Sequence, residues 1–382
     1  MAHNEKINIS KEKPLVLFSP LDWGLGHTTR SIPLIRELIV QGCSVIVACN
    51  SVQKSVLIHE FPQIAFVPLE GYRLKYGRSR LFTYLALIAQ LPKILIKVKR
   101  EQAWLKRFLQ QKRVDALVSD NRYGFFSKEI PSVFITHQLK IRTGSGSLAD
   151  RIIQARIYKM IEKFSECWIP DFKGERNAAG KLSHPSRLPE IPTKYLGCVS
   201  RFTRSPSTLL YERLIILSGP EPQRTILEKL LLEQIRNMPG RTAIVRGLPG
   251  AADSPPPSGD ALVVNHVPSH QLNEMVLASR FVISRSGYTT IMDLLGLNKK
   301  MILIPTPGQP EQEYLANYLA SKDLAVTMTQ SKFCLRAAEE TAAKLRFQFM
   351  DEHMNEYKTV VRQFVELLKR RKAAATPPTG GH

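Results

Sequence analysis

Short apolar runs alternate with longer amphipathic runs along most of this chain of 382 residues. A short apolar run is typical of a buried strand, and an amphipathic run that repeats about every 3.6 residues is typical of a helix. Their alternation predicts parallel sheets with helices on both faces. In the first half of the chain we expect strands at 15–19, 44–49, 64–68, 114–119 and 132–136, with helices at about 28–41, 52–60, 80–111 and 147–164.

The pattern weakens between about 171 and 212, where prolines and polar residues predict a loop and interdomain linker. A second series follows, with strands expected at 214–217, 242–245, 261–264, 281–284 and 301–305, helices at 223–237, 288–296 and 311–320, a surface loop at 253–260 and a last helix at about 351–372. The predicted fold class is therefore α/β, with two Rossmann-like parallel-sheet domains that face each other across a cleft. We place an N-terminal domain at 1–200, a C-terminal domain at 201–350, a helix that packs back on the N-terminal domain at 351–372 and a disordered tail at 373–382.

Charge is the unusual feature of the composition, because 54 Lys and Arg against 33 Asp and Glu give a net charge of +21. Such an excess predicts anionic partners, namely nucleic acid, nucleotides or an anionic membrane surface. The five cysteines are scattered and never form a CxxC pair, so we expect a reducing compartment and neither a disulfide framework nor a structural zinc site. No apolar run approaches the ~18 residues of a membrane-spanning helix, and the polar N-terminus does not resemble a signal peptide. We expect a soluble or peripheral protein.

The loop at 19–33 follows the first expected strand and holds two glycines before a histidine. Gly24 and Gly26 let the backbone turn sharply, and the helix that follows offers free N–H groups to an anion. His27 is expected at the mouth of the cleft, where an imidazole can take a proton from a hydroxyl. Thr29 occupies the third glycine position of a dinucleotide motif, so an ordinary dinucleotide site is not favoured. The alternative is a glycine-rich turn with a surface histidine.

The segment 283–319 is the most informative part of the chain. An expected strand runs into a turn, and a helix begins directly after it. Hydroxyls, a guanidinium and the helix N-terminus can together hold a diphosphate. The residues assigned to this contact are Arg285, Ser286, Gly287, Thr289 and Thr290. Asp293 on the same helix can accept a hydrogen bond from a ribose hydroxyl, and the alternative is a solvated carboxylate.

Amides and carboxylates crowd the turn before the next helix, where they suit the hydroxyls of a sugar. The residues predicted to contact it are Gln309, Gln312 and Glu313. The alternative is an ordinary helix start, with Pro310 in the first turn and acidic residues that complement the helix dipole. Glu311 and Glu313 fit that alternative well, whereas the two glutamines fit it less well.

Further candidate contacts lie at other strand ends. Small residues predict a phosphate or hydroxyl contact at Ser218 and Gly219, and the backbone at His266 and Val267 is placed to read a base edge. Polar residues in the first half that are placed to bind an acceptor are Asp120, Asn121 and His137. Plain turns, and buried polar groups that satisfy loop backbones, are the alternatives.

At these residues the sequence resembles the GT-B glycosyltransferases of the family that includes bacterial MurG N-acetylglucosaminyltransferases and plant monogalactosyldiacylglycerol synthases. The likeness is clearest in SRSGYTTIMDLLGLNKKMILIPTPGQPEQEYLANYL (284–319), which is similar to the donor-site signature of their C-terminal domain, of the glycosyltransferase family 28 type. The glycine-rich loop that ends in His27 is similar to the N-terminal signature. The resemblance implies sugar transfer from a nucleotide-sugar, usually a UDP-sugar, with inversion at the anomeric carbon and no essential metal. No cofactor is expected beyond the nucleotide-sugar as co-substrate.

The resemblance also implies roles for single residues. The turn at 285–290 matches the diphosphate-binding turn, and Asp293 stands where the family usually has a ribose-binding Glu. Gln312 and Glu313 match a pair that contacts the donor sugar, although an acid replaces the second amide. His27 matches the loop histidine and is the candidate base or acceptor-orienting group. The loop at 218–220 reads Ser-Gly-Pro rather than Gly-Gly-Ser.

The segment 73–113 holds twelve Lys or Arg and one acid, Glu101, interleaved with leucines and isoleucines. A basic helical segment that is apolar over more than one face predicts contact with an anionic membrane surface, and a lipid-linked acceptor would follow. The alternative is that the aliphatic residues pack on the first sheet while the cations form a solvated face. Nucleic acid is a less favoured partner because no recognition motif or stacking aromatics are present.

The main hypothesis is thus an inverting, metal-independent hexosyltransferase, peripheral on the inner face of the cytoplasmic membrane. A nucleotide-sugar epimerase or hydrolase of the same architecture is the first alternative. A non-catalytic basic module that binds membranes is the second.

Overall fold

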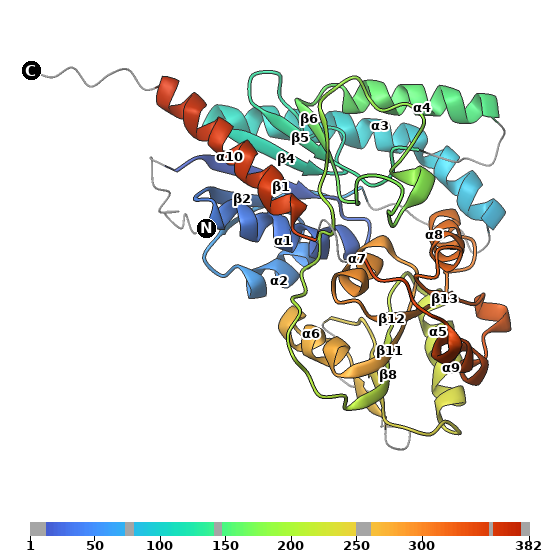
Figure 1. Ribbon diagram of the computed structural model, residues 1–382. Coiled ribbons are helices and arrows are strands. Elements are labelled where there is room, and N and C mark those ends of the chain that lie inside the picture. The colour runs from blue at the N-terminus through green and yellow to red at the C-terminus, as the bar shows by residue number, and fades with distance from the viewer. Residues whose placement is uncertain (1–12, 73–79, 141–146, 250–260, 351–353, 376–382) are drawn as a thin grey trace, which may run out of the picture.

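The computed structural model describes residues 13–72, 80–140, 147–249, 261–350 and 354–375, with the backbone alone for 80–92 and 147–150 (Figure 1). The surface loop expected at 253–260, and the part of the basic segment at 73–79, lie outside the described residues. Within the described parts, no helix is long and apolar enough to cross a membrane.

The first sheet has seven parallel strands in the order β3-β2-β1-β4-β5-β6-β7. Its strands are β1 (Leu15–Pro20), β2 (Ser44–Cys49), β3 (Ala65–Pro68), β4 (Ala116–Asp120), β5 (Ser132–Ile135), β6 (Glu166–Ile169) and β7 (Thr193–Tyr195). The first five were expected. β7 lies in the segment that the sequence assigned to loop and linker, because a three-residue polar edge strand has no apolar run to reveal it.

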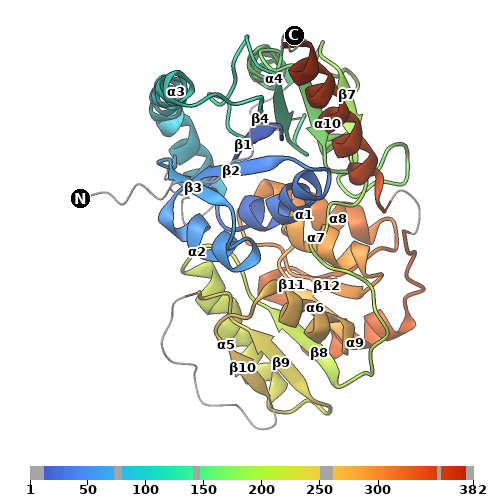
Figure 2. The same ribbon diagram turned by 90° about the vertical axis from the view of Figure 1, so that its left-hand side faces the viewer.

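Helices cover both faces of this sheet. They are α1 (Gly26–Val40), α2 (Ser51–Glu60), α3 (Arg80–Gln111) and α4 (Ser147–Ile161), with a short 3₁₀ turn η1 (Gly180–Leu182). α1 and α2 pack on one face, and the last helix, α10 (Glu356–Ala375), returns to the same face, where Val361 and Phe364 join the core. α3 and α4 cover the opposite face (Figures 1 and 2). We call this sheet and its five helices the N-terminal lobe.

The second sheet has six parallel strands in the order β10-β9-β8-β11-β12-β13. Its strands are β8 (Tyr211–Ile216), β9 (Thr242–Val245), β10 (Leu262–Val264), β11 (Ser279–Ser284), β12 (Lys300–Leu303) and β13 (Val326–Thr327). Its helices are α5 (Gln223–Ile235), α6 (Ser269–Leu277), α7 (Tyr288–Gly296), α8 (Pro310–Ala320), the 3₁₀ turn η2 (Gln330–Lys332) and α9 (Leu335–Lys344). α6, α7 and α8 lie over one face, and α5 and α9 over the other. This is the C-terminal lobe, and together the two sheets confirm the predicted α/β class.

The strand order of each sheet reverses once, between β1 and β4 in the first and between β8 and β11 in the second. In open parallel sheets, ligands bind outside the carboxyl ends of the strands at such a reversal. The loop after β1 leads into α1, and the loop after β11 leads into α7. These two helices contact each other between the sheets (Figures 1 and 2). The topology thus brings the two predicted loops to one place.

Candidate active site between the lobes

His27 lies in the first turn of α1, and its partner comes from the end of β4. Nδ1 of His27 is 3.1 Å from Oδ1 of Asp120. Asp120 is fully buried, and Arg30, one turn further along α1, donates to both of its carboxylate oxygens. Burial alone would raise the pKa of Asp120, but Arg30 and then His27 lower it to about 2. The carboxylate is therefore ionised at neutral pH.

The same nitrogen of His27 also lies 2.9 Å from Nη2 of Arg30. A guanidinium can only donate and a carboxylate can only accept, so Nδ1 satisfies one of the two neighbours at a time. With its proton on Nδ1, the ring donates to Asp120 and leaves Nε2 with a free lone pair. With its proton on Nε2, the ring accepts from Arg30. Asp120 and Arg30 therefore favour opposite tautomers of His27.

Arg30 also connects this cluster to the opposite lobe. Its Nη1 lies 2.9 Å from Nδ1 of His137, in the loop after β5, and Nε2 of His137 lies 2.8 Å from Oε1 of Glu311 in the first turn of α8. Because Nδ1 accepts from Arg30, the ring proton sits on Nε2 and is donated to Glu311. Burial lowers the pKa of His137, although Glu311 acts in the opposite direction, so this imidazole is neutral at pH 7.

The turn that begins α7 faces the N-terminal lobe. Oγ1 of Thr289 donates to the backbone oxygen of Gly26 at 3.0 Å. The ring of Tyr288 stacks on His137 with 4.0 Å between ring centroids, and its hydroxyl donates to the backbone oxygen of Pro170. The start of the predicted diphosphate-binding helix therefore meets the start of the His27 helix.

The α7 turn leaves space for a ligand. No side chain caps α7, and a Cβ built on Gly287 would meet nothing within 4 Å. Since the first N–H groups of a helix have no partner within it, they are available to an anion. The Ser286 hydroxyl, by contrast, is used within the lobe, where it donates to the backbone oxygen of Gln312 at 2.8 Å. Thr290 is partly exposed in the first turn.

Arg285 is buried and forms hydrogen bonds with the loops that pack behind the α7 turn. Its guanidinium donates to the backbone oxygens of Ile304, Pro305 and Gln223 at 2.8 to 3.3 Å, and to the side chain of Gln330 at 2.6 Å. Burial lowers the pKa of Arg285 to about 10, which leaves it charged at pH 7. Its Nε has no hydrogen-bond partner among the described residues.

Asp293 is also engaged by protein groups, because both of its oxygens bind the segment that links the lobes. Oδ1 accepts from the Ser200 hydroxyl at 2.9 Å, and Oδ2 accepts from Nε of Arg201 at 3.1 Å. A solvated carboxylate, the alternative to a ribose contact, is therefore not what the structure has. In the folded chain Asp293 ties α7 to the linker.

The residues at the start of α8 hold the preceding loop. Gln312 accepts from the backbone N–H of Thr306 at 2.9 Å and donates to the side chain of Gln309. Glu313 accepts from the backbone N–H of Gly308 at 3.1 Å. The hydroxyl of Thr306 is buried without a partner among the described residues, opposite Gly219. These contacts match the helix-start alternative and leave the side chains of Gln309, Gln312 and Glu313 half-buried.

The remaining predicted residues lie at strand ends, as expected. Gly24 and Gly219 both have positive φ angles, +71° and +101°, which glycine adopts without strain. Ser218 is half-buried after β8, His266 is exposed and Val267 is buried after β10. Asn121 follows Asp120 with φ at 63°, and its buried Oδ1 has no partner among the described residues.

Sequence reasoning missed Arg30 and Tyr288, and it did not select Glu311 from the polar residues before α8 as a site residue. The available signal for Arg30 was its spacing, since three residues after His27 places it on the same face of α1.

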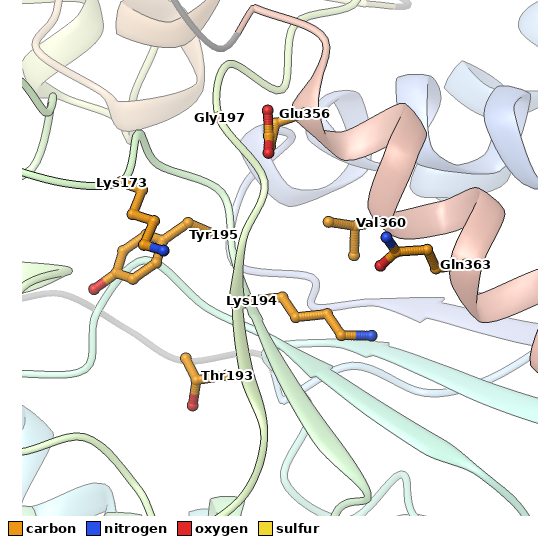
Figure 3. Close-up of a pocket in the computed structure, with 8 residues that line it drawn as sticks. All are labelled: Lys173, Thr193, Lys194, Tyr195, Gly197, Glu356, Val360 and Gln363. Carbon is orange, nitrogen blue, oxygen red and sulfur yellow. The ribbon is translucent and has the colours of Figure 1, made fainter.

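Within the described residues, no group of three His, Cys, Asp or Glu side chains is placed to hold a metal ion. A separate cavity of about 260 Å³ lies between β7 and α10, lined by Lys194 and Val360 among others, and no predicted site residue borders it (Figure 3).

Part of the chain is similar in sequence to known proteins. Residues 263–370 match the model of the glycosyltransferase family 28 C-terminal domain. A UDP-N-acetylglucosamine–N-acetylmuramyl-(pentapeptide) pyrophosphoryl-undecaprenol N-acetylglucosamine transferase of Rhodopseudomonas palustris (strain BisA53) is 38% identical over 69 residues. That match covers 17% of this chain and 18% of the length of the relative.

Solved structures are similar over nearly the whole chain. The glycotransferase of kitacinnamycin has a TM-score of 0.61 at 16% identity, covering 95% of this chain and 98% of that one. MurG of Acinetobacter baumannii has a TM-score of 0.51 at 15% identity, covering 94% and 99%. At these identities the likeness concerns the fold. The chain thus has the GT-B fold, and its residues 263–370 are similar to the C-terminal domain of glycosyltransferase family 28.

Proposed function

We propose that this chain is an inverting glycosyltransferase that moves a hexose from a nucleotide-sugar to the hydroxyl of an acceptor. One observation carries the proposal: His27 pairs with the buried Asp120 at 3.1 Å, directly beside the contact between Gly26 and the α7 turn. A base on one lobe thereby faces an anion-binding helix start on the other. The R. palustris relative is named for a UDP-sugar, which supports a UDP-sugar as donor.

The proposed reaction is a single displacement. The acceptor oxygen attacks the anomeric carbon as Nε2 of His27 takes its proton, while the bond from that carbon to the diphosphate oxygen breaks. The electron pair of that bond leaves with the nucleotide diphosphate, and attack from the opposite side inverts the anomeric carbon. Asp120 stabilises the imidazolium that forms, in the manner of a His–Asp pair. The helix N-terminus of α7 stabilises the charge of the leaving group, so that no metal is required.

For the donor we retain the predicted contacts. Gly287, Thr289 and Thr290 would bind the diphosphate through the α7 turn, together with Ser286 and the Nε of Arg285. Ser218 and Gly219 would complete the phosphate site, His266 and Val267 the base site, and Gln309, Gln312 and Glu313 the sugar site. Asp293 would reach a ribose only by releasing Arg201. On the acceptor side we propose Gly24 and Asn121, whereas both ring nitrogens of His137 are held by Arg30 and Glu311.

The decisive experiment compares His27→Ala with His59→Ala, an exposed histidine on α2. We expect the first variant to lower kcat by about 10²-fold or more, with donor affinity by calorimetry changed less than about twofold. Equal losses of turnover and affinity would make His27 a binding residue. Release of free sugar at full rate without an acceptor would favour the hydrolase or epimerase. Failure to bind any of the UDP-, GDP- and dTDP-sugars would favour the membrane-binding module.

The acceptor is proposed to be lipid-linked and reached from the inner face of the cytoplasmic membrane. On α3, Leu95 and Ile96 are 56% and 52% exposed among Lys93, Lys99 and Arg100, which supports contact with an anionic bilayer. Further along α3, Leu105 packs into the first sheet, so the packing alternative describes that end of the helix. Exchanging Leu95 and Ile96 for Ser should reduce co-sedimentation with phosphatidylglycerol vesicles. Ile226→Ser, at an exposed position of α5, is the control, and equal losses would contradict the proposal.

A further inference from the structure

One face of α8 docks on the N-terminal lobe through three residues spaced three and four apart. Glu311 accepts from His137 at 2.8 Å. One turn later the hydroxyl of Tyr314 accepts from the backbone N–H of Lys181 at 2.8 Å, and the hydroxyl of Tyr318 donates to Asn177 at 2.9 Å. This spacing places all three side chains on one side of the helix. The helix that carries the proposed sugar contacts is thus also the helix that joins the lobes.

The first of these contacts continues to the proposed base. From Glu311 the path runs to His137, from His137 to Arg30 at 2.9 Å, and from Arg30 to Nδ1 of His27 at 2.9 Å and to the carboxylate of Asp120. His137 and Arg30 are buried, and the stacked ring of Tyr288 fixes the plane of His137. When Nδ1 of His27 carries the proton, as the proposed base requires, the last step of the path runs through Asp120, which accepts from both Arg30 and His27.

We infer that Glu311 is a positioning residue, which orients His27 across the lobe interface through His137 and Arg30. This inference rests on the proposed role of His27 as the base. It extends that role, because it makes the orientation of the base depend on a residue of the opposite lobe.

The physical reason lies in the tautomer of His137. Glu311 holds the ring proton on Nε2, which leaves Nδ1 as an acceptor for Arg30. Without Glu311, a proton on Nδ1 would face the N–H donor of Arg30, and two donors at 2.9 Å repel. The guanidinium would then turn away from His137 and change its hold on Asp120 and His27. Asp120 would lose the donor that fixes its carboxylate, and with it the acceptor that keeps the His27 proton on Nδ1 and leaves Nε2 free.

The kinetic test compares Glu311→Ala, Glu311→Gln and Tyr318→Phe. We expect Glu311→Ala to lower kcat by about tenfold at saturating substrates while the KM for the donor changes less than about twofold. Glu311→Gln should restore most of the rate, because the amide oxygen still accepts from Nε2. Tyr318→Phe removes another hydrogen bond between the lobes and should leave kcat nearly unchanged. Equal losses in the Ala and Phe variants would reduce Glu311 to a docking contact, and a large rise in donor KM would make it a substrate contact.

A second measurement is independent of turnover. Long-range ¹H–¹⁵N spectra of ¹⁵N-histidine-labelled protein report the tautomer of each ring, with His137→Gln and His27→Ala variants for assignment. We expect His137 as the Nε2–H tautomer in the wild type and a shifted His27 signal in Glu311→Ala but not in Tyr318→Phe. An unchanged His27 signal in Glu311→Ala would overturn the inference. If the wild type transferred no sugar, the proposed function would fail while these spectra still decided the coupling.

Discussion

The exchange Asp120→Asn tests the buried ion pair on which the proposed base depends. Asp120 is fully buried at the end of β4, where Arg30 binds both of its oxygens and His27 lies at 3.1 Å. The variant keeps the shape of the side chain and one acceptor oxygen. It leaves the buried guanidinium of Arg30 without its counter-charge, and it removes the group that stabilises a protonated His27.

The magnitude follows from the pKa of Asp120. Burial raises this pKa, but Arg30 and His27 lower it more, so that it falls from 3.8 to about 2. At about 1.4 kcal/mol per pKa unit, the ionised carboxylate contributes roughly 2–3 kcal/mol to the free energy of unfolding at neutral pH. Because the folded-state pKa is depressed, this contribution is complete above the unfolded pKa and is lost as the pH falls through the folded value. The loss of the counter-charge of Arg30 destabilises the folded variant further. We therefore expect Asp120→Asn to lower the free energy of unfolding by about 3 kcal/mol in all.

Urea unfolding at pH 7 measures this loss, and Glu60→Gln is the matched control. Glu60 pairs at 2.9 Å with Arg36, which is half exposed, and such pairs contribute less than about 1 kcal/mol. The difference between the wild type and Asp120→Asn should narrow by about 1 kcal/mol between pH 7 and pH 3, since the carboxylate of the unfolded wild type is then largely protonated. The reasoning would be refuted if Asp120→Asn and Glu60→Gln lost equal free energy of unfolding at pH 7. It would also be refuted if the difference between the wild type and Asp120→Asn stayed constant down to pH 3.

Three further predictions concern other parts of the chain. Arg285→Ala removes hydrogen bonds to several loop carbonyls, so we expect it to lower the free energy of unfolding by about 2–4 kcal/mol. It should also weaken UDP binding measured by calorimetry. A loss of stability with unchanged UDP affinity would mean that Arg285 has a structural role alone. Gly180→Ala places a Cβ 2.4 Å from the hydroxyl of Tyr314 and should lower Tm more than Gly174→Ala, where φ is also positive but nothing lies within 4 Å. Cys334 is the one exposed cysteine of the five, so a thiol reagent should label one group per chain at pH 8; more labelled thiols in the folded protein would contradict the burial of the others.

The sequence predicted most strands and helices because each was long or strongly patterned. The expected helix at 288–296 coincides with α7, and the expected helix at 80–111 coincides with α3. The sequence missed three short strands, β6, β7 and β13, because runs of four, three and two residues carry little periodic signal. The last helix begins at Glu356 and continues to Ala375, a few residues later at each end than expected, which is the usual error of boundaries read from pattern alone.

The candidate site was predictable as a set of loops but not as a set of contacts. The glycines and the histidine of the loop before α1 identified the loop correctly, because strand ends at a topological reversal gather in one place. The partner of His27 was assigned to the acceptor instead, since Asp120 is 93 residues away and pairing over that separation has no local signature. For Arg285 the sequence predicts an anion contact, because a cation stands beside a helix start, but it gives no sign of the four protein oxygens that the guanidinium binds in the structure.

The contact between the lobes also explains why an anion belongs at this site. α1 and α7 meet start to start, with the Thr289 hydroxyl on the Gly26 carbonyl, and neither helix has an acidic residue in its first turn. Each helix start carries a partial positive charge of roughly half an elementary charge, so bringing two together is unfavourable unless negative charge lies nearby. Asp120 is neutralised by Arg30, and Glu311 is committed to His137. We therefore expect a ligand to supply the charge that offsets the two helix ends, and a nucleotide diphosphate at Gly287 would place it where the lobes meet, next to the proposed base.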